Sequence, residues 1–427
     1  MTRHVPLLAL AAAALACVPA CAPARPATPL QPTFGSAAGV IAEPAAVGAR
    51  RLHPLADSVR RAAVLDSVRR VLDRAVADSA FPGAFAVVGD AEGGYVASGA
   101  GRIDWAADAP RPNAATLWDL ASLTKVVGTT SAVMQLVGSG RLQLDAPVQR
   151  YLPEWTGPGR ERVTIRHLLT HTSGLPAWRP LYKEATSPES ALGLVIATQP
   201  DTTPGVRYVY SDLNFILLGT IVARLTGEPL DRYDARHVFA PLGMRDTRYR
   251  PDPRDLARVA PTEFDPWRQR KLRGEVHDEN AYALGQVAGH AGLFSTGADL
   301  ARLARAYLNG GTLDGRRVFE PAVVAEFTRV QDTTVSRRAL GWETPTGGNS
   351  AGHYLSPRAF GHTGFTGTSL WMDPEHDVYL VLLTNRVNPT RMNTKIGRVR
   401  VALADAVMQA LGAAPVFPAP AAPTSAR

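Results

Sequence analysis

The chain of 427 residues contains very little cysteine and very little lysine. Its only cysteines are Cys17 and Cys21, so no disulfide can form beyond them and the fold must rely on its hydrophobic core. Only 4 of the 46 basic residues are lysines, which leaves 46 − 4 = 42 arginines. The net charge of +8 is modest, and the arginines are scattered along the chain. We therefore expect no nucleic-acid partner, because such a partner requires a basic stripe.

Further absences narrow the class of protein. No G-x-S-x-G elbow, P-loop or G-x-G-x-x-G fingerprint stands in a context of strand and helix that would support it. This excludes an α/β-hydrolase and the common nucleotide-dependent enzymes. A hydrophobic content of 45% and a charged content of 20% are ordinary globular values, which excludes global disorder.

The N-terminus has the features of an export signal. A short basic start precedes an apolar run over 5–16, which has the length of a signal core and is too short to span a bilayer. Cys17 and Cys21 each follow small residues, as in a bacterial lipoprotein cleavage box; the alternative is ordinary cleavage near Ala22. We expect a signal peptide over 1–21 and an exported protein, either periplasmic or anchored to the membrane as a lipoprotein.

The composition of the rest of the chain distinguishes a linker, a folded domain and a tail. The Ala- and Pro-rich segment 22–56 has no apolar periodicity and is typical of a flexible linker. Residues 415–427 have a similar composition and are predicted to be a flexible tail. One folded domain is therefore expected over 57–414, which is long enough to bury a large core.

Apolar spacing predicts strands at both ends of this domain and helices between them. The expected elements are a helix over 57–79, a hairpin over 84–88 and 95–97, a helix over 122–137, paired strands over 369–372 and 378–384, and a closing helix over 396–411. This order predicts an α+β fold in which a mostly helical lobe is inserted, with a cleft between the two lobes.

The first chemical motif is Ser122-x-x-Lys125 at the start of a predicted helix. Residues i and i+3 share a helix face, so the lysine amine can lie beside the serine hydroxyl. Serine needs a neighbouring base, and lysine can serve if its surroundings lower its pKa, whereas arginine cannot lose its proton. The helix start also directs an N–H at a developing oxyanion. The alternative is a helix cap with a surface lysine.

Two further motifs follow in the chain. Tyr210-Ser211-Asp212 precedes a predicted helix, and the tyrosine could carry a proton to a leaving group if Lys125 lowers its pKa. Packing is the alternative role for this aromatic ring. His362-Thr363-Gly364 precedes a predicted strand, where small residues let an extended substrate lie along the backbone. A structural turn is the alternative role for His362.

The order S-x-x-K, Y-x-[ND] and [KH]-T-G resembles the serine β-lactamase and penicillin-binding-protein superfamily, in particular the branch of class C β-lactamases, secreted DD-peptidases and related esterases. Segments 168–175, 241–244 and 289–296 are similar to the same branch, and the resemblance covers about 80–410. It implies a β-lactamase/DD-peptidase-like α+β fold, with an antiparallel sheet flanked by helices and the active site in the cleft. It also implies neither cofactor nor metal.

The resemblance assigns a role to each motif residue. Ser122 would be acylated, Lys125 and Tyr210 would transfer protons, and the backbone N–H groups of Ser122 and Phe365 would bind the oxyanion. The residues expected to bind substrate are Asp212, His362, Thr363 and Gly364. His362 stands where β-lactamases usually have lysine, and the His-Thr-Gly triplet is similar to that of certain secreted DD-peptidases. Asp212 stands where many relatives have asparagine.

Two other pairs of polar residues point less clearly to a catalytic or binding role. His167 and His171 have i, i+4 spacing, but no H-E-x-x-H glutamate lies between them, so we expect structural roles. His277 and Asp278 could either contact substrate or lie in a solvated loop.

The expected activity is that of an exported serine hydrolase forming an acyl-enzyme at Ser122. The resemblance favours D-amino-acid peptides or amides of cell-wall type, so the expected partner is a small or peptidoglycan-derived substrate, with the membrane as a second partner through a lipid anchor. Alternatives are an esterase or a β-lactamase, and a penicillin-binding sensor that turns over poorly. A tethered structural domain would require the three motifs to be accidental.

Overall fold

The structure is a computed structural model that describes residues 54–418. The chain divides into two units, 1–50 and 51–427, and only the second contains described residues. The predictions for the signal peptide, for Cys17 and Cys21 and for nearly all of the linker therefore lie outside the described residues. Between residues 54 and 418, none of the helices combines the length and the apolar character that a membrane crossing needs.

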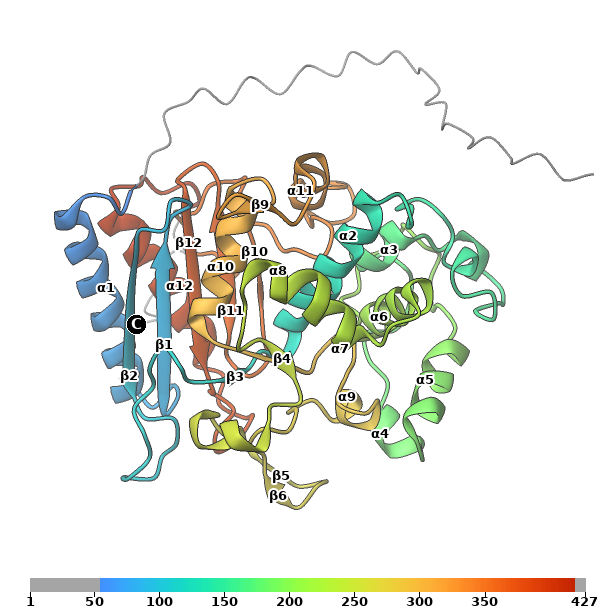
Figure 1. Cartoon of the computed structure of the whole chain (residues 1–427), viewed down its shortest axis with the longest axis horizontal. Helices are drawn as coiled ribbons and strands as arrows, with labels where there is room; N and C mark the ends of the chain where they lie inside the picture. The colour runs from blue at the N-terminus through green and yellow to red at the C-terminus, as the bar shows by residue number, and fades with distance from the viewer. Residues whose placement is uncertain (1–53, 419–427) are drawn as a thin grey trace, which may run out of the picture. The chain divides into compact units, whose positions relative to one another are not determined.

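A five-stranded antiparallel sheet joins the two ends of the folded chain (Figure 1). Its order is β10-β11-β12-β1-β2, and the strands are β1 (Gly83–Gly89), β2 (Tyr95–Gly101), β10 (Phe360–Thr363), β11 (Ser369–Asp373) and β12 (Val378–Thr384). Val87 of β1 lies opposite Val381 of β12. The predicted hairpin and the predicted C-terminal strand pair are confirmed, as is the α+β fold.

Helices cover both faces of this sheet (Figure 1). Ala84, Ala86 and Val88 of β1 pack in the core cluster formed with α1 (Ser58–Ala77) and α12 (Ile396–Ala410). Phe85 and Val87 point to the opposite face, where α10 (Gly297–Leu308) packs. Adjacent residues of a strand point to opposite faces, so this central strand is buried on both sides and is apolar throughout.

The segment between β2 and β10 contains most of the helices, as the sequence predicts. Besides α10, they are α2 (Ser131–Gly138), α3 (Ile165–Leu169), α4 (Leu181–Glu184), α5 (Pro188–Ala197), α6 (Asp212–Thr226), α7 (Leu230–Tyr233), α8 (Ala240–Leu242), α9 (Glu279–Ala283) and α11 (Pro321–Thr328). Small sheets connect them: β3 (Trp118–Asp119), β7 (Leu293–Ser295) and β4 (Arg248–Tyr249) in the order β3-β7-β4, β5 (Phe264–Asp265) with β6 (Arg270–Lys271), and β8 (Thr312–Leu313) with β9 (Arg316–Arg317).

The predicted helix over 122–137 is not a regular α-helix at its start. A 3₁₀ turn over Ala121–Leu123 leads into a π-helical turn over Lys125–Thr130, and only then does α2 begin. The Ser131 hydroxyl donates to the carbonyl of Val126, five residues back, at 3.2 Å, which accompanies the wider turn. Such π turns occur frequently at functional sites.

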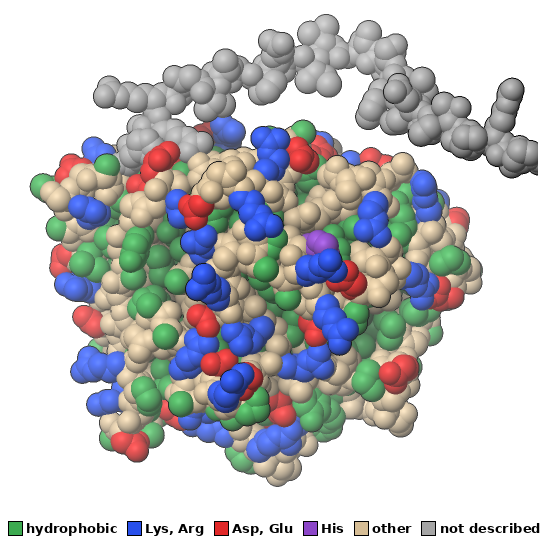
Figure 2. Space-filling view, viewed as in Figure 1, with side chains coloured by type: hydrophobic (Ala, Val, Ile, Leu, Met, Phe, Trp, Pro, Cys, Tyr) green, Lys and Arg blue, Asp and Glu red, His purple; other side chains and the backbone are tan. Residues whose placement is uncertain are grey.

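Charges of both signs are interspersed on the face shown in Figure 2. Many surface arginines form ion pairs with neighbouring carboxylates, such as Arg166 with Asp145 and Glu326. The scattered arginines of the sequence therefore lie among acidic side chains in the fold.

Candidate active site

Ser122 follows a tightly held turn. Ala121, directly before it, has a positive φ of 46°, which is uncommon for a residue with a side chain. The buried Asp119 carboxylate accepts the N–H of Ala121 at 2.8 Å with one oxygen and the N–H of His277 at 2.7 Å with the other. Burial raises the pKa of Asp119 to about 6. Asp119 therefore orients the turn that presents Ser122, and no sequence motif pointed to it.

Lys125 is fully buried beside Ser122. Its Nζ donates to Ser122 Oγ at 2.9 Å and to the carbonyl of His290 at 3.1 Å, and it lies 2.7 Å from Asp212 Oδ1. Burial alone would lower the pKa of this amine, but the charge of Asp212 and the contact with Tyr210 outweigh burial and the pKa is raised. The lysine of the resting site is an ammonium ion, so the condition of a lowered pKa is not met.

Tyr210 lies close to both groups. The Lys125 Nζ is 5.0 Å from the centre of its ring, and the buried His171 packs against the other side at 4.5 Å between ring centres. Burial raises the pKa of Tyr210, although Lys125 acts in the opposite direction. Lys125 thus acts in the expected direction, but burial outweighs it, so the condition of a lowered pKa is not met and Tyr210 is a neutral phenol in the resting site. The structural role expected for His171 includes the support of this ring and of the Ser211 N–H, which donates to its Nδ1 at 3.0 Å.

Two acidic residues and a histidine surround the ammonium of Lys125. Asp278 caps the start of α9 and lies 2.9 Å from His290 Nε2, and donor atoms of Asp212, Asp278 and His290 lie within 4.8 Å of one another. Such a group could hold a metal ion, but the ammonium of Lys125 is already the cation that Asp212 contacts. We place no metal here.

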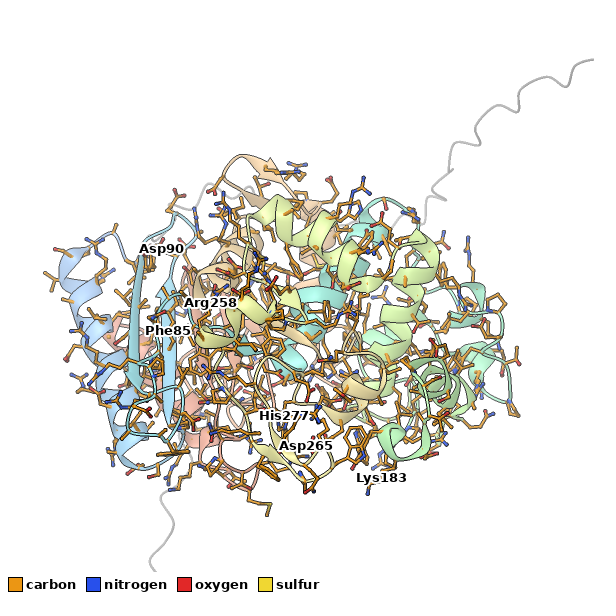
Figure 3. All side chains as sticks on the ribbon, turned by 60° about the horizontal axis from the view of Figure 1, so that its bottom comes forward. Phe85, Asp90, Lys183, Arg258, Asp265 and His277 are labelled. Carbon is orange, nitrogen blue, oxygen red and sulfur yellow. The ribbon has the colours of Figure 1, made fainter. Side chains whose placement is uncertain are left out.

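His277, in the loop before α9, is not solvated, so that alternative is wrong for His277, whereas the Asp278 side chain is 26% exposed. Only 3% of the His277 side chain is exposed, and burial lowers its pKa to about 4. Its ring stacks on Phe365 at 5.6 Å between centres. Arg268 connects this loop to β5, since it donates to the His277 carbonyl at 2.7 Å and forms an ion pair with Asp265. His277 and Asp265 are labelled in Figure 3.

His362 lies on β10, opposite Leu370 of β11. Its Nδ1 lies 2.8 Å from the Thr363 carbonyl and so carries a proton, which leaves the buried Nε2 as an acceptor with no partner among the described residues. Burial and the charges of Arg338 and Lys125 hold the pKa of His362 well below its usual range. The histidine is neutral and supplies no positive charge in place of the lysine of β-lactamases.

The turn after β10 is attached to the residues that precede Ser122. The hydroxyl of Thr366 donates to the Asp119 carbonyl at 2.7 Å, and that of Thr368 to the Leu120 carbonyl at 3.0 Å. A Cβ on Gly364 would lie 2.3 Å from the Leu120 oxygen, so only glycine permits this approach. The two segments expected to form the oxyanion hole therefore lie against each other.

Ser122 opens into a pocket of about 370 Å³. Its walls are Ser122, Tyr208, Tyr210, Glu343, His362, Thr363, Gly364, Phe365, Arg386 and Arg400. Ser122 and Tyr210 thus share one pocket with Phe365, His362, Thr363 and Gly364, whereas Asp212 faces Lys125 instead.

Two arginines of this pocket were not singled out in the sequence. Arg400, from α12, donates to the carbonyls of Gly364 at 2.7 Å and Thr368 at 2.8 Å. Arg386 donates to the carbonyl of Phe365 at 2.8 Å and lies 4.4 Å from the centre of its ring. Burial lowers the pKa of both, for Arg400 to about 10, so both stay charged at neutral pH. Among 42 arginines, nothing in the sequence distinguishes these two.

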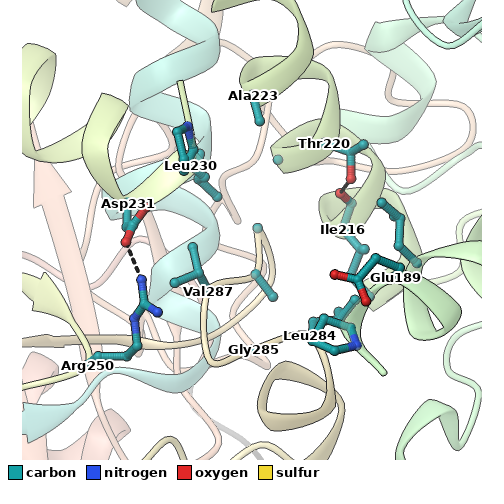
Figure 4. A pocket seen from close by; sticks show the side chains of 16 residues that line it. Glu189, Ile216, Thr220, Ala223, Leu230, Asp231, Arg250, Leu284, Gly285 and Val287 are labelled. Atoms are coloured by element: carbon teal, nitrogen blue, oxygen red, sulfur yellow. Dashed lines mark hydrogen bonds and ion pairs between the residues drawn. The ribbon is translucent and has the colours of Figure 1, made fainter. Parts of the chain in front are cut away.

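A second pocket, of about 400 Å³, lies between α5, α6, α7 and the loop over 284–289 (Figure 4). Its walls are mainly apolar, and Arg250 pairs with Asp231 at its edge. It shares no residue with the pocket at Ser122 and presents no serine, cysteine or lysine. We therefore assign the chemistry to the Ser122 pocket.

The proteins that are similar to this chain agree with the assignment of the active site to the Ser122 pocket. The family model described as Beta-lactamase matches residues 68–404, which is most of the chain. The chain belongs to the Beta-lactamase family. It is 34% identical over 318 residues to a Salmonella agona protein named "Putative D-alanyl-D-alanine carboxypeptidase", an alignment that covers 66% of this chain and 72% of that protein.

Solved structures of other proteins share the fold of this chain. A penicillin-binding protein homologue from Caulobacter crescentus has a TM-score of 0.67 at 22% identity, over 81% of this chain and 97% of that one. A hydrolase described as having promiscuous acyltransferase activity has a TM-score of 0.67 at 22% identity, over 82% of this chain and 100% of that one. The resemblance seen in the motifs is confirmed, and the protein is a serine hydrolase of the β-lactamase type.

Proposed function

We propose that this protein is an exported DD-carboxypeptidase-like hydrolase that removes the last residue of D-amino-acid peptides through an acyl-enzyme on Ser122. The name of the Salmonella relative supports the reaction. The observation that carries the proposal is the pair of buried, charged arginines, Arg386 and Arg400, in the wall of the Ser122 pocket. A peptide that is cut before its last residue brings a free carboxylate close to the scissile bond.

Each group at the site has a role in this reaction. Ser122 Oγ attacks the carbonyl carbon, and the N–H groups of Ser122 and Phe365 bind the oxygen as it becomes negative. The neutral Tyr210 is able to donate its proton to the departing amine. Water then attacks the acyl-enzyme by the reverse route and releases the shortened peptide.

The carboxylate end of the substrate is proposed to lie beside Thr363 and Gly364. His362 offers only a neutral acceptor there, which favours a substrate hydroxyl or amide N–H and not an anion. Arg400 and Arg386 donate to carbonyl oxygens, and the charges of Glu343, in the same pocket wall, and of Glu263 act on them at longer range. The positive potential that remains at this end of the pocket is proposed to attract the carboxylate.

Export and anchoring belong to the same proposal. A hydrolase of cell-wall peptides must reach the outside of the membrane, and the predicted signal over 1–21 would direct it there. Lipid attachment at Cys17 or Cys21 would make the membrane a partner, and segment 22–56 would be the tether.

The test is the release of D-alanine from an N-acylated peptide ending in D-Ala-D-Ala, by the wild type and by Ser122→Ala. We expect release by the wild type and loss of at least about 10⁴-fold in the variant. Full activity in Ser122→Ala would overturn the mechanism. Hydrolysis of p-nitrophenyl esters or nitrocefin without D-alanine release would identify an esterase or a β-lactamase, and a lasting adduct with a penicillin without turnover would identify a sensor.

A further inference from the structure

The bonding of Lys125 leaves its amine no free lone pair. An ammonium has three N–H groups. Lys125 donates to Ser122 Oγ at 2.9 Å and to the His290 carbonyl at 3.1 Å, and its Nζ forms an ion pair with Asp212 Oδ1 at 2.7 Å. The Lys125 amine, which is hydrogen-bonded to the nucleophile Ser122 Oγ, therefore already carries its three protons. It can accept the Ser122 proton only if one of its own protons leaves at the same time.

Asp212 is the one contact of this ammonium that can receive a proton. The carbonyl of His290 is not basic, whereas Asp212 Oδ1 is a carboxylate oxygen that lies 2.7 Å from Lys125 Nζ and has no hydrogen-bond partner among the described residues. The Asp212 side chain is 19% exposed, and the backbone N–H of this residue is held by the Ala177 carbonyl at 3.0 Å. The carboxylate therefore has a fixed position at the first residue of α6.

Resting on the proposed acylation of Ser122, we propose that Asp212 is the terminal acceptor of the Ser122 proton and that Lys125 relays it. As Ser122 Oγ attacks, its O–H bond breaks and a new N–H bond forms on Lys125. A different N–H bond of Lys125 breaks, and an O–H bond forms on Asp212. The positive charge stays on Lys125 beside the tetrahedral intermediate, while the negative charge moves from Asp212 to the substrate oxygen.

This relay makes use of the departure from the family pattern at Asp212. An asparagine amide at this position could accept a hydrogen bond from Lys125, but its oxygen is not basic enough to keep a proton. The proton on Asp212 later returns through Lys125 and Tyr210 to the leaving group. Asp212 is thus a positioning residue that acts through Lys125, and it does not itself contact substrate.

Other charged and titratable groups face this relay from several elements. They are Tyr210 before α6, Asp278 at α9, His290 before β7, His171 after α3, His362 on β10, and Arg338. Asp278 is the nearest competing carboxylate, but it is bonded to His290 at 2.9 Å and to the Ala281 N–H at 2.7 Å. Asp278→Asn is therefore the matched control.

The experiment compares pH profiles of single-turnover acylation by p-nitrophenyl acetate in the wild type and in Asp212→Asn, Asp212→Glu and Asp278→Asn. The nitrophenolate leaves without needing a proton, so the acylation rate reports deprotonation of Ser122. In Asp212→Asn the relay is lost and only a neutral Lys125 can act. We expect a loss of about 10²-fold near neutral pH and an acid limb at least about one pH unit higher than in the wild type.

The opposite shift would overturn the proposal. If a neutral Lys125 is already the base and Asp212 only raises its pKa, removing the carboxylate moves the acid limb to lower pH and increases the rate at neutral pH. An unchanged acid limb in Asp212→Asn, or an equal upward shift of the limb in Asp278→Asn, would also exclude Asp212 as the proton acceptor. Asp212→Glu should keep the wild-type limb, and thermal unfolding of every variant checks the fold.

Failure of this relay and failure of the proposed function are distinguishable. The ester assay reports the relay whether or not D-alanine is released from the peptide. Ser122→Ala, run in the same assay, reports whether acylation occurs at Ser122 at all.

Discussion

The active site buries cations in two different ways. Lys125 is fully buried and contacts the carboxylate of Asp212 at 2.7 Å, so its charge is balanced. Arg386 and Arg400, in the wall of the same pocket, are bound by backbone carbonyl oxygens, and Glu263 and Glu343 act on them only at longer range, so their charge is balanced less closely than that of Lys125. Both arrangements stabilise a buried cation, but only the first provides a basic oxygen for a proton, and only the second attracts an anion from outside.

The difference explains why the rare lysine and the abundant arginine are not exchangeable here. An ammonium can pass a proton between two oxygens, whereas a guanidinium keeps its protons at any pH that the fold tolerates. A planar guanidinium can bind carbonyl oxygens and a carboxylate at once.

The largest effect should come from Lys125→Arg. The variant keeps a cation next to Asp212 but cannot relay a proton, so we expect kcat/KM to fall by at least about 10³-fold. Arg400→Lys, the reciprocal exchange, keeps the charge and should cost less than about 10-fold. Steady-state hydrolysis of the ester and the peptide measures both, and equal losses in the two variants would remove the distinction.

Asp119 supports the turn in front of Ser122 and should affect stability with a defined pH dependence. Its pKa in the fold, about 6, lies above the ordinary 3.8, so its contribution to stability is present below about pH 3.8 and is lost as pH rises through 6. The difference in unfolding free energy between wild type and Asp119→Asn should therefore fall by up to about 3 kcal/mol over this interval. Urea unfolding near pH 4 and pH 7.5 measures it, and a constant difference would contradict the assigned pKa.

Arg400→Gln should separate substrates by charge. Loss of this cation should lower kcat/KM about 10- to 100-fold for a peptide with a free carboxylate, mainly through KM. Hydrolysis of the neutral p-nitrophenyl acetate should change by less than about threefold. Equal losses on both substrates would mean that Arg400 serves only to hold the Gly364–Thr368 turn.

The smallest effect is expected at an exposed cation. Arg70 and Asp66 form an i, i+4 pair on α1, and both side chains are more than 60% exposed. Arg70→Ala should change the free energy of unfolding by less than about 0.5 kcal/mol and leave activity unaltered, because water and salt screen the pair. Thermal unfolding at low and high salt is the measurement, and a cost above 1 kcal/mol would show that this pair is not screened.

The sequence was sufficient for four of the five strands of the sheet and for the motif residues of the Ser122 pocket. Alternation and turn residues located β1, β2, β11 and β12 but not β10, and the S-x-x-K spacing placed Lys125 beside Ser122 because both lie in one helical turn. The π-helical widening after Lys125 was not predicted, because it depends on side-chain bonds such as that of Ser131 to the Val126 carbonyl.

What the sequence did not predict depends on contacts between distant segments. Asp119 binds the N–H of His277, which lies 158 residues further along the chain. Arg386 and Arg400 become parts of the site only because the strands and α12 bring them to the Phe365 turn. The raised pKa values of Lys125 and Tyr210 arise from the balance of burial and charge in the folded site, which the linear order of residues does not show.

The most direct test of the account compares one N-acylated D-Ala-D-Ala peptide with its C-terminal amide. Because Arg386 and Arg400 place positive charge in the wall of the Ser122 pocket, kcat/KM for the free carboxylate should exceed that for the amide by at least about 100-fold. The ratio of kcat/KM for the free carboxylate to kcat/KM for the amide should be smaller in Arg400→Gln. Equal hydrolysis of the two peptides, or release of D-alanine from neither, would contradict the assignment of this pocket to a carboxylate-ended substrate.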